Sequence, residues 1–217
     1  MSLAPYLSFP QLDSLVVYCA TVSNYEGRLS PSERAIVQHA VEKRRREFAT
    51  GRLCAHQGIV AITGGIDAVI TSDAERRPVW PTGICGSITH TDETALAVVA
   101  RSSQYAGLGI DAEVISRVSE DLWPRLLRKE EIAGLNRRSD AAVKFSAKEA
   151  VYKAINPLVG EFIGFQEVSI KLDPSLNEFT VAYHGEHEPN RRLETGRGHF
   201  RVEGDLAICL FIIGNRL

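Results

Sequence analysis

Two short segments of this 217-residue chain carry the residue types that phosphate chemistry needs. Gly109–Glu113 is predicted to be a strand, in which Asp111 and Glu113, two residues apart, lie on the same side. The other segment, Phe145–Lys153, is predicted to be a helix, with Glu149 and Lys153 four residues apart on one face. Brought together, these side chains would suit a hard cation that holds a phosphate, with ammonium groups at the phosphate's other oxygens.

Each segment also has an ordinary explanation. Exposed strand ends often carry acids, and Glu149 with Lys153 can be a helix salt bridge worth about 0.3 kcal/mol. In the second segment, Lys148 directly precedes Glu149 and Phe145 lies one helical turn earlier, so the pattern is larger than a single ion pair. Because magnesium keeps several of its waters, two or three carboxylates are enough to hold it beside a substrate phosphate. The predicted metal ligands are Asp111, Glu113 and Glu149.

Basic residues gather in a second region, where Lys43–Arg46 is followed by Arg52. They could simply form a solvated helix face. Arg45 and Arg52 are seven residues apart, however, and so share a face of a helix. Arginines on one face can dock a phosphate through forked hydrogen bonds. Arg77, beside Pro78, adds another cation next to a rigid turn.

A third segment, Gly86–Thr91, combines small residues with possible anion donors. Small residues permit close backbone approach, and Thr89 and His90 offer donors. A lone histidine is more often structural than functional, so His90 stands out only because glycine, serine and threonine surround it. The other histidines show no spacing that indicates catalysis or metal binding.

Helix signals are clearest in the first half. Ser30 and Glu33 form a capping-box pattern around Pro31, and one long helix is expected from there to Gly64–Gly65, with Ile36 and His39 among its inner residues. Strands are expected at Val16–Ala20, Thr94–Ala100, Ala106–Ile110, Val168–Leu172, Phe179–Tyr183, His199–Glu203 and Leu206–Ile213.

The second half is expected to contain a helix over Leu126–Leu135 and another, capped by Ser139, that runs to about Ile155. Asn156–Pro157 should stop the latter. The change-over between halves falls near residues 104–110, and no residue-level repeat or linker is visible. We therefore predict an α+β chain of two closely packed halves.

Composition narrows the class of protein. The chain is 44% hydrophobic and 24% charged, typical of a soluble globular protein, and its net charge of −2 argues against a general nucleic-acid binder. No apolar run approaches the roughly 20 residues of a membrane span. Met1–Tyr6 lacks the features of a secretion signal, so a cytoplasmic location is expected. The four cysteines form no C-x-x-C pair and are expected to be reduced thiols.

Taken together, the motifs resemble the 4′-phosphopantetheinyl transferase family, in its surfactin-type, two-lobed branch and the enterobactin-synthase (siderophore) subgroup. Each block is weak alone, but five in the family's order are highly specific. Phe145 stands where many surfactin-type members have Trp, although the siderophore subgroup often has Phe, and Ala112 replaces a larger aliphatic residue. The matching blocks are Lys43–Arg52, Arg77–Pro81, Gly86–His90, Gly109–Glu113 and Phe145–Lys153, and Pro157–Gly160 also fits the subgroup.

The resemblance implies a magnesium-dependent transfer of the phosphopantetheine arm of coenzyme A to a serine of an apo acyl or peptidyl carrier protein. The by-product would be adenosine 3′,5′-bisphosphate. Glu149 would help to deprotonate the serine, directly or through a metal-bound water, and Lys153 and Lys148 would contact the pyrophosphate. The implied metal ligands are Asp111, Glu113 and Glu149, and the implied nucleotide-phosphate ligands are Arg52, Arg77, Thr89 and His90, with Arg45 less certain.

The implied fold is two similar α/β lobes with pseudo-twofold symmetry, residues 1–105 and 106–217, with the active site in the cleft between them. A monomer is expected because two lobes already build the cleft. Siderophore peptide synthetases, polyketide synthases and polyunsaturated fatty acid synthases all remain possible sources of the carrier. The alternatives are a magnesium-dependent phosphohydrolase that acts on coenzyme A-like substrates and a coenzyme A-binding module without turnover.

Overall fold

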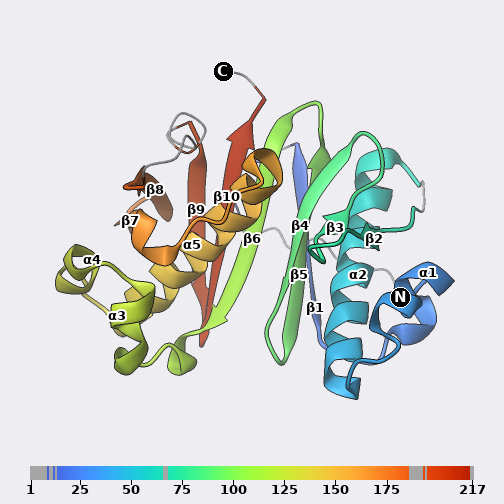
Figure 1. The fold of residues 1–217 in the computed structure, drawn as a ribbon, viewed down its shortest axis with the longest axis horizontal. Coiled ribbons are helices and arrows are strands. Elements are labelled where there is room, and N and C mark those ends of the chain that lie inside the picture. Colours follow the sequence, from blue (N-terminus) through green and yellow to red (C-terminus); the bar gives the residue numbers. More distant parts are fainter. Residues whose placement is uncertain are drawn as a thin grey trace. The chain divides into compact units, whose positions relative to one another are not determined.

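The computed structural model describes residues 9, 12, 14–65, 68–185, 193 and 195–215. Met1–Tyr6, used above to predict location, lies outside the described residues. Two compact units divide the chain, Met1–Tyr105 and Ala106–Leu217 (Figure 1). Both combine helices with an antiparallel sheet, which confirms the predicted α+β class.

The first unit is built on a three-stranded sheet in the order β1-β5-β4. Its strands are β1 (Leu15–Thr21), β4 (Ile84–His90) and β5 (Thr94–Arg101), with Val17 opposite Val98 and Ser87 opposite Val98 on the other side. The central strand β5 is a continuous apolar run whose residues 95–100 are fully buried. The short strands β2 (Thr71–Ser72) and β3 (Pro78–Val79) form a separate ribbon.

The segment before Gly64 forms two helices, although one long helix was predicted there. A 3-10 turn η1 (Glu26–Arg28) leads to α1 (Pro31–Val37), whose start is the predicted capping box of Ser30 and Glu33. The chain then turns, and α2 (Glu42–Thr63) begins after an extended Val41. Because of this turn, α1 does not continue the apolar stripe of α2. The assignment of Ile36 and His39 to an inner face was therefore wrong, and both are exposed.

Glycines bring α2 directly onto the sheet. A Cβ atom at Gly58 would lie 2.5 Å from Val99 Cγ2, and one at Gly51 would lie 2.8 Å from Ile88 Cγ2. The helix ends at Gly64, as predicted, because that residue adopts a left-handed conformation with φ of 80°.

The second unit contains a five-stranded sheet in the order β6-β10-β9-β8-β7. Most strands extend one or two residues beyond the predicted ranges, and β6 joins the two predicted segments, Ala106–Ile110 and Gly109–Glu113, so Asp111 and Glu113 lie inside one strand. Gly204, with φ of 59°, forms the turn between the last two strands. The strands are β6 (Tyr105–Val114), β7 (Val168–Asp173), β8 (Glu178–Tyr183), β9 (Arg197–Glu203) and β10 (Leu206–Gly214).

The helices of this unit differ from the prediction in detail. The single helix expected over Leu126–Leu135 is instead two short helices, α3 (Trp123–Leu126) and α4 (Lys129–Ala133). The long helix α5 (Arg138–Val159) begins before Ser139, so the predicted cap was wrong. Asp140 accepts the Arg137 N–H at 3.0 Å instead. The 3-10 turns are η2 (Ile115–Arg117), η3 (Glu120–Leu122) and η4 (Phe165–Glu167).

Pro157 does not stop α5, contrary to the prediction. It lies in the last turn, and the helix ends at Gly160, which has φ of 71°. A proline removes only one backbone donor, which the final turn tolerates because α5 also packs on β10, β9 and β7. The side chains of Ala150, Val151 and Ile155 are fully buried in this core.

An internal repeat becomes visible in the topology. In each unit the first strand pairs with the last, β1 with β5 and β6 with β10, and the penultimate strand lies next to the last. Each unit also has a short helix followed by a 22-residue helix that ends at a left-handed glycine. The repeat is one of topology, and no residue-level repeat was visible in the sequence.

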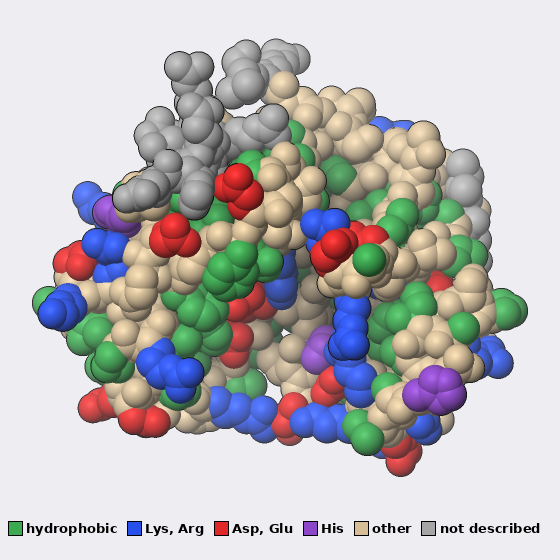
Figure 2. Space-filling model, in the orientation of Figure 1, with side chains coloured by type: hydrophobic (Ala, Val, Ile, Leu, Met, Phe, Trp, Pro, Cys, Tyr) green, Lys and Arg blue, Asp and Glu red, His purple; other side chains and the backbone are tan. Residues whose placement is uncertain are grey.

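Charged side chains of both signs lie beside one another on the molecular face of Figure 2. Over the described residues, no helix combines the length and hydropathy that a membrane span requires. All four cysteines are free thiols, as predicted.

Candidate functional site

Two glycines of β6 allow α5 to lie directly against that strand. A Cβ atom at Gly109 would be 1.8 Å from the carbonyl oxygen of Ala150, and one at Gly107 would be 2.4 Å from that of Ala154. Side chains alternate along a strand, so Asp111 shares the face of these glycines and points toward α5. Glu113, two residues later, points the same way.

The structure brings Lys153 to this acidic face. Its Nζ atom donates to Asp111 Oδ1 at 2.6 Å and to the Ile110 carbonyl oxygen at 3.3 Å. The Asp111 side chain is only 6% exposed, whereas that of Lys153 is 28% exposed. The lysine therefore spans from α5 to β6 and is not confined to a surface pair with Glu149, the ordinary explanation considered above.

The acids of this cluster repel one another. Burial, followed by the charges of Asp111 and Glu149, raises the pKa of Glu113 to about 7, although Lys153 acts in the opposite direction. Burial and the charge of Asp111 likewise raise the pKa of Glu149, again against Lys153. Three ionised carboxylates with one ammonium leave an excess of negative charge, which a divalent cation would neutralise.

Oxygen ligands and this charge excess fit a hard ion such as Mg²⁺. Within the part of the chain that the structure describes, however, no three acidic, histidine or cysteine side chains already form a metal-binding arrangement. The ammonium of Lys153 occupies one oxygen of Asp111. The donor chemistry thus fits the ion, while the metal-ligand assignments of Asp111, Glu113 and Glu149 remain predictions.

Lys148 lies elsewhere in the unit and is engaged internally. Its side chain is 1% exposed, and Nζ donates to Glu131 Oε2 at 2.6 Å, to the Phe165 carbonyl oxygen at 2.7 Å and to the Leu126 carbonyl oxygen at 3.0 Å. An ammonium has three N–H donors, and these contacts use all of them. This geometry does not support the expected contact between Lys148 and a pyrophosphate.

A cluster of cations forms in the first unit at the end of β4. His90 points toward α2, where its ring lies against the Arg44 guanidinium. The carboxylate of Glu47, which is 8% exposed, lies 3.5 Å from His90 Nδ1, 3.6 Å from Arg44 Nη1 and 3.9 Å from Lys43 Nζ. Arg44 was not singled out from the sequence, although helical spacing places it three residues before Glu47.

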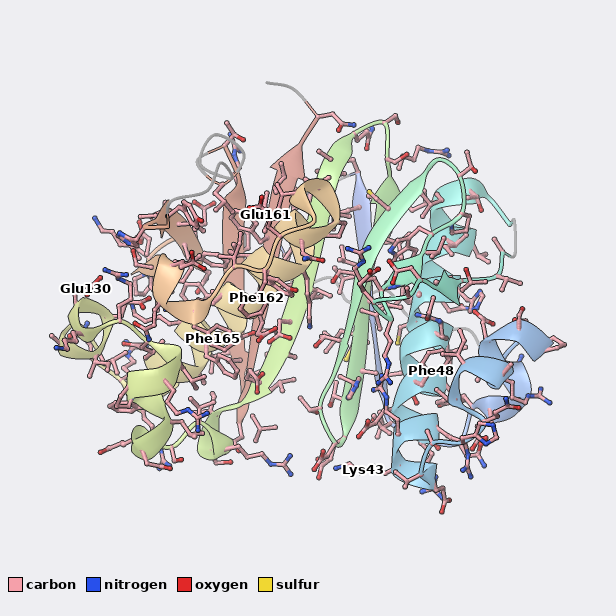
Figure 3. All side chains as sticks on the ribbon, viewed as in Figure 1. Lys43, Phe48, Glu130, Glu161, Phe162 and Phe165 are labelled. Carbon is pink, nitrogen blue, oxygen red and sulfur yellow. The ribbon has the colours of Figure 1, made fainter. Side chains whose placement is uncertain are left out.

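Arg45 and Arg52 both turn toward η1 and α1, so their predicted common face is confirmed. Arg45 bonds Glu26 Oε2 at 3.1 Å and the Ala40 carbonyl oxygen at 2.8 Å. Arg52 is 5% exposed, and its guanidinium carbon lies 4.6 Å from the ring centroid of Phe48, labelled on α2 in Figure 3. Burial lowers the pKa of Arg52 to about 10, which still leaves it charged at neutral pH.

The remaining two predicted phosphate ligands do not join the His90 cluster. Arg77 is held in the turn before β3, where Nε donates to Asp73 Oδ2 at 2.7 Å and Nη2 to Glu75 Oε2 at 3.0 Å. Thr89 is buried and, as the neighbour of His90 in β4, faces the opposite side of the sheet. The sequence could not distinguish these environments because each depends on the turn or face that the fold assigns.

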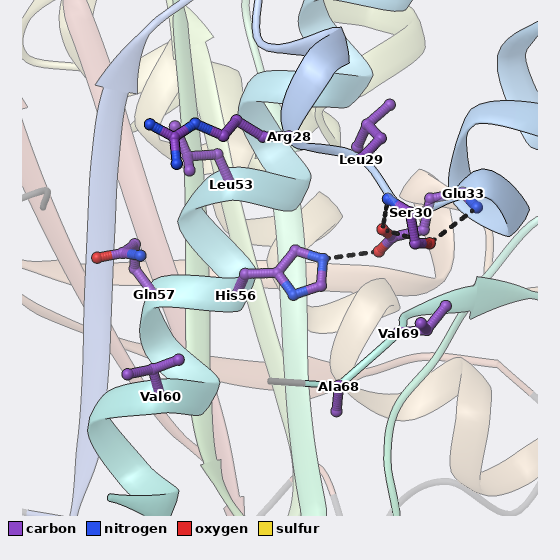
Figure 4. Close-up of a pocket in the computed structure, with 10 residues that line it drawn as sticks. All are labelled: Arg28, Leu29, Ser30, Glu33, Leu53, His56, Gln57, Val60, Ala68 and Val69. Carbon is purple, nitrogen blue, oxygen red and sulfur yellow. Dashed lines mark hydrogen bonds and ion pairs between the residues drawn. The ribbon is translucent and has the colours of Figure 1, made fainter. Parts of the chain in front are cut away.

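Glu33 is the centre of a buried network that joins α1, α2 and the segment before β2. Its carboxylate accepts from His56 Nε2 at 2.7 Å and from the backbone N–H of Ile70 at 3.2 Å, and it lies 3.9 Å from Arg52 Nε. A cavity of about 390 Å³ lies beside this network and is lined by Leu29, by Glu33 of α1 and by residues of α2 that include His56 (Figure 4). The capping-box pattern had indicated Glu33 only as a helix cap.

Two protein-family models match the chain. Residues 32–100 match the 4′-phosphopantetheinyl transferase N-terminal domain, and residues 107–209 match the 4′-phosphopantetheinyl transferase superfamily. The two matched ranges contain the cation cluster of the first unit and the acidic cluster of the second, respectively.

Two of the three similar proteins described next have the same family name. The chain is 35% identical to 4′-phosphopantetheinyl transferase Svp of Streptomyces mobaraensis, over 85% of this chain and 78% of Svp. It is 30% identical to 4′-phosphopantetheinyl transferase PptT of Mycobacterium tuberculosis, over 84% of this chain and 85% of PptT. It is 34% identical to enterobactin synthase component D of Escherichia coli, over 71% of this chain and 73% of that protein.

Proposed function

Because the chain belongs to the 4′-phosphopantetheinyl transferase superfamily, we propose that it transfers the phosphopantetheine arm of coenzyme A to a serine of an acyl or peptidyl carrier protein. The observation that carries this proposal is the meeting of Asp111, Glu113, Glu149 and Lys153 in one cluster. Phosphoryl transfer depends mainly on positioning and charge neutralisation, which such a cluster can supply.

In the proposed reaction, the serine oxygen bonds to the phosphorus that carries pantetheine. The serine proton passes to Glu149, directly or through a water molecule. The bond from that phosphorus to the bridging pyrophosphate oxygen breaks, and adenosine 3′,5′-bisphosphate leaves with that oxygen and the bonding electron pair. Lys153 stabilises the charge that grows on the leaving phosphate, because its ammonium already reaches the acidic face of β6.

Asp111, Glu113 and Glu149 are the side chains that would hold Mg²⁺. When bound, the ion would neutralise charge on the pyrophosphate. Support comes from the raised pKa of Glu113 and of Glu149, which reflects negative charge that Lys153 alone does not offset.

The 3′-phosphate of the nucleotide is assigned to the cations of the first unit. Arg44 and His90 lie together at the end of β4 with part of their surfaces exposed to solvent. Arg52, Arg77 and Thr89 stay in this proposal as weaker assignments, because both arginines have bonding partners in the first unit and Thr89 is buried. Arg45 is left out of this proposal because its guanidinium bonds both Glu26 and a backbone carbonyl.

The proposed carrier belongs to a siderophore or another secondary-metabolite synthase, which is consistent with the similarity to enterobactin synthase component D. We propose that the enzyme is cytoplasmic. We also propose that it is a monomer, because the two units of one chain hold all the residues assigned above. Light scattering after size-exclusion chromatography tests the monomer, and a dimer at micromolar concentration would contradict it.

Intact-mass analysis of apo carrier proteins from the source organism tests the reaction. With coenzyme A and Mg²⁺, a carrier should gain the mass of one phosphopantetheine, and the same carrier with its serine replaced by alanine should not. A magnesium-dependent phosphohydrolase, the alternative reaction, would release phosphate or phosphopantetheine from coenzyme A without any carrier. A binding module would change neither substrate, and either result would overturn the transferase proposal.

A further inference from the structure

The buried pair of Lys148 and Glu131 joins α5 to the elements around it. Besides Lys148, the Glu131 carboxylate accepts the Arg128 N–H at 2.8 Å and the Ile170 N–H at 2.8 Å. Its side chain is 3% exposed. One carboxylate therefore links the start of α4, the strand β7 and the middle of α5. Lys148 extends the link to η4 through the carbonyl oxygen of Phe165, labelled in Figure 3.

An anchor at Lys148 sets the rotation of α5 about its own axis. Each helical residue turns by about 100°, so Glu149 points about 100° and Lys153 about 140° away from Lys148, on one side of the helix. Ala150 and Ala154, which contact the glycines of β6, point still further round the axis. With Lys148 held by Glu131 and the alanines held by β6, Glu149 and Lys153 are directed to the acidic face of that strand.

We propose that the Lys148–Glu131 pair is a positioning device for the chemical step, and that Lys148 does not bind the substrate. This inference rests on the proposed function. It predicts that loss of either partner rotates or shifts α5, so that Glu149 and Lys153 no longer meet Asp111 correctly. Coenzyme A affinity should change little, because the nucleotide cations belong to other elements.

The internal repeat supports an architectural role. Arg52 lies ten residues after the first residue of α2, and Lys148 lies ten residues after the first residue of α5. Arg52 lies 3.9 Å from Glu33, which is the third residue of α1. Glu131, the partner of Lys148, is likewise the third residue of α4. Glu33 and Glu131 each accept a backbone N–H from an isoleucine, Ile70 or Ile170. A buried carboxylate in the same position thus joins the short helix to the long one in both units, although in the first unit the 2.7 Å bond to Glu33 comes from His56 of α2.

Four variants of the full chain test the proposal: Lys148→Met, Glu131→Gln, the double variant, and Ile155→Ala as a control. Ile155 is a fully buried residue of α5 outside the site, so its truncation lowers stability without touching the pair. Measurements are melting temperature, coenzyme A affinity by calorimetry, and transfer rate to an apo carrier at a temperature where every variant is folded. Wild-type transfer to that carrier is established first, so failure of the proposed function is detected separately.

Each single variant should lower kcat at least tenfold and leave coenzyme A affinity within about threefold. The double variant should melt no lower than Lys148→Met, because no buried charge is left alone, yet turn over no faster than either single variant. Ile155→Ala should lose melting temperature but keep its kcat.

Two results would overturn the proposal. If Lys148→Met weakens coenzyme A at least tenfold while Glu131→Gln does not, Lys148 is a substrate ligand. If kcat follows melting temperature across all four variants, or recovers in the double variant, the pair serves stability alone.

Discussion

Lys153 of α5 donates a 2.6 Å hydrogen bond to Asp111 of β6 and so connects the two elements that carry the acidic cluster. The bond crosses 42 positions of the sequence. It exists because Gly107 and Gly109 let the backbone of α5 approach the strand. Lys153 is thus held over the carboxylates while about a quarter of its side chain stays exposed to solvent and available to a substrate.

Lys153→Ala should lower the maximal transfer rate by about a hundredfold or more, with little change in coenzyme A affinity. The ammonium is proposed to act on charge that develops only in the transition state. Lys153→Arg should recover little, because a planar fork cannot replace a compact charge in this position. Steady-state transfer, combined with calorimetry for coenzyme A, makes the comparison. Near-wild-type turnover in Lys153→Ala would show that the lysine only pairs with acids, at a stability cost below about 0.5 kcal/mol.

Glu113→Gln should keep the fold and weaken the response to Mg²⁺. The variant removes one charge from a cluster in which the pKa of Glu113 is raised to about 7 by burial and by its acidic neighbours. We expect Mg²⁺ to raise the melting temperature of the wild type, because ligands that bind the folded state stabilise it. That shift and the Mg²⁺-dependent rate should both fall in Glu113→Gln. The control is Glu120→Gln, which changes an exposed acid of η3. Equal Mg²⁺ responses in the two variants would exclude Glu113 as a ligand.

Adjacent arginines of α2 provide a matched pair for the nucleotide site. Arg44→Ala should weaken coenzyme A binding by about ten- to a hundredfold, since a charged hydrogen bond is worth about 1.5–3 kcal/mol. It should scarcely affect 3′-dephospho-coenzyme A. Arg45→Ala should bind both ligands nearly as the wild type does, because Arg45 bonds Glu26 and Ala40 instead. An unchanged preference for coenzyme A over its 3′-dephospho form in Arg44→Ala would refute the assignment.

The acid stability of the first unit should depend on Glu33. Burial alone would raise the pKa of Glu33. Hydrogen bonds from His56 and Ser30, together with the charge of His56, instead lower this pKa from 4.5 to about 2. A lowered pKa stabilises the fold above pH 4.5, and this contribution, at most about 3 kcal/mol, is lost as the pH falls toward 2. Urea unfolding of wild type and Glu33→Gln between pH 6 and pH 2.5 measures it. The stability difference should shrink with acid, and a constant difference would contradict the expectation.

Local signals determined several features correctly. The spacing of Asp111 and Glu113 placed both acids on one face of a strand, and Ser30 with Glu33 located the start of α1. Apolar segments of strand type identified β1, β5 and the five strands of the second unit, whereas β2, β3 and β4 were not predicted. These features depend on one element at a time, and side-chain direction within an element follows from its periodicity.

The partners of the charged residues could not be predicted in the same way. Lys148 and Lys153 are both lysines on one helix, yet one is buried against Glu131 and the other reaches Asp111. Arg44 and Arg45 are neighbours, yet one meets His90 and the other Glu26. Nothing in the local spacing separates the members of either pair.

The sequence by itself therefore determined the α+β class and the transferase family, and it predicted a set of acids and cations for the proposed reaction. The tertiary structure decided which of those cations are anchors and which remain accessible to a substrate. Glu131 and Phe165 reach α5 from different elements, and only the packing of those elements brings both to Lys148. An ion pair depends on the distance between distant parts of the chain, and that distance is a property of the folded core.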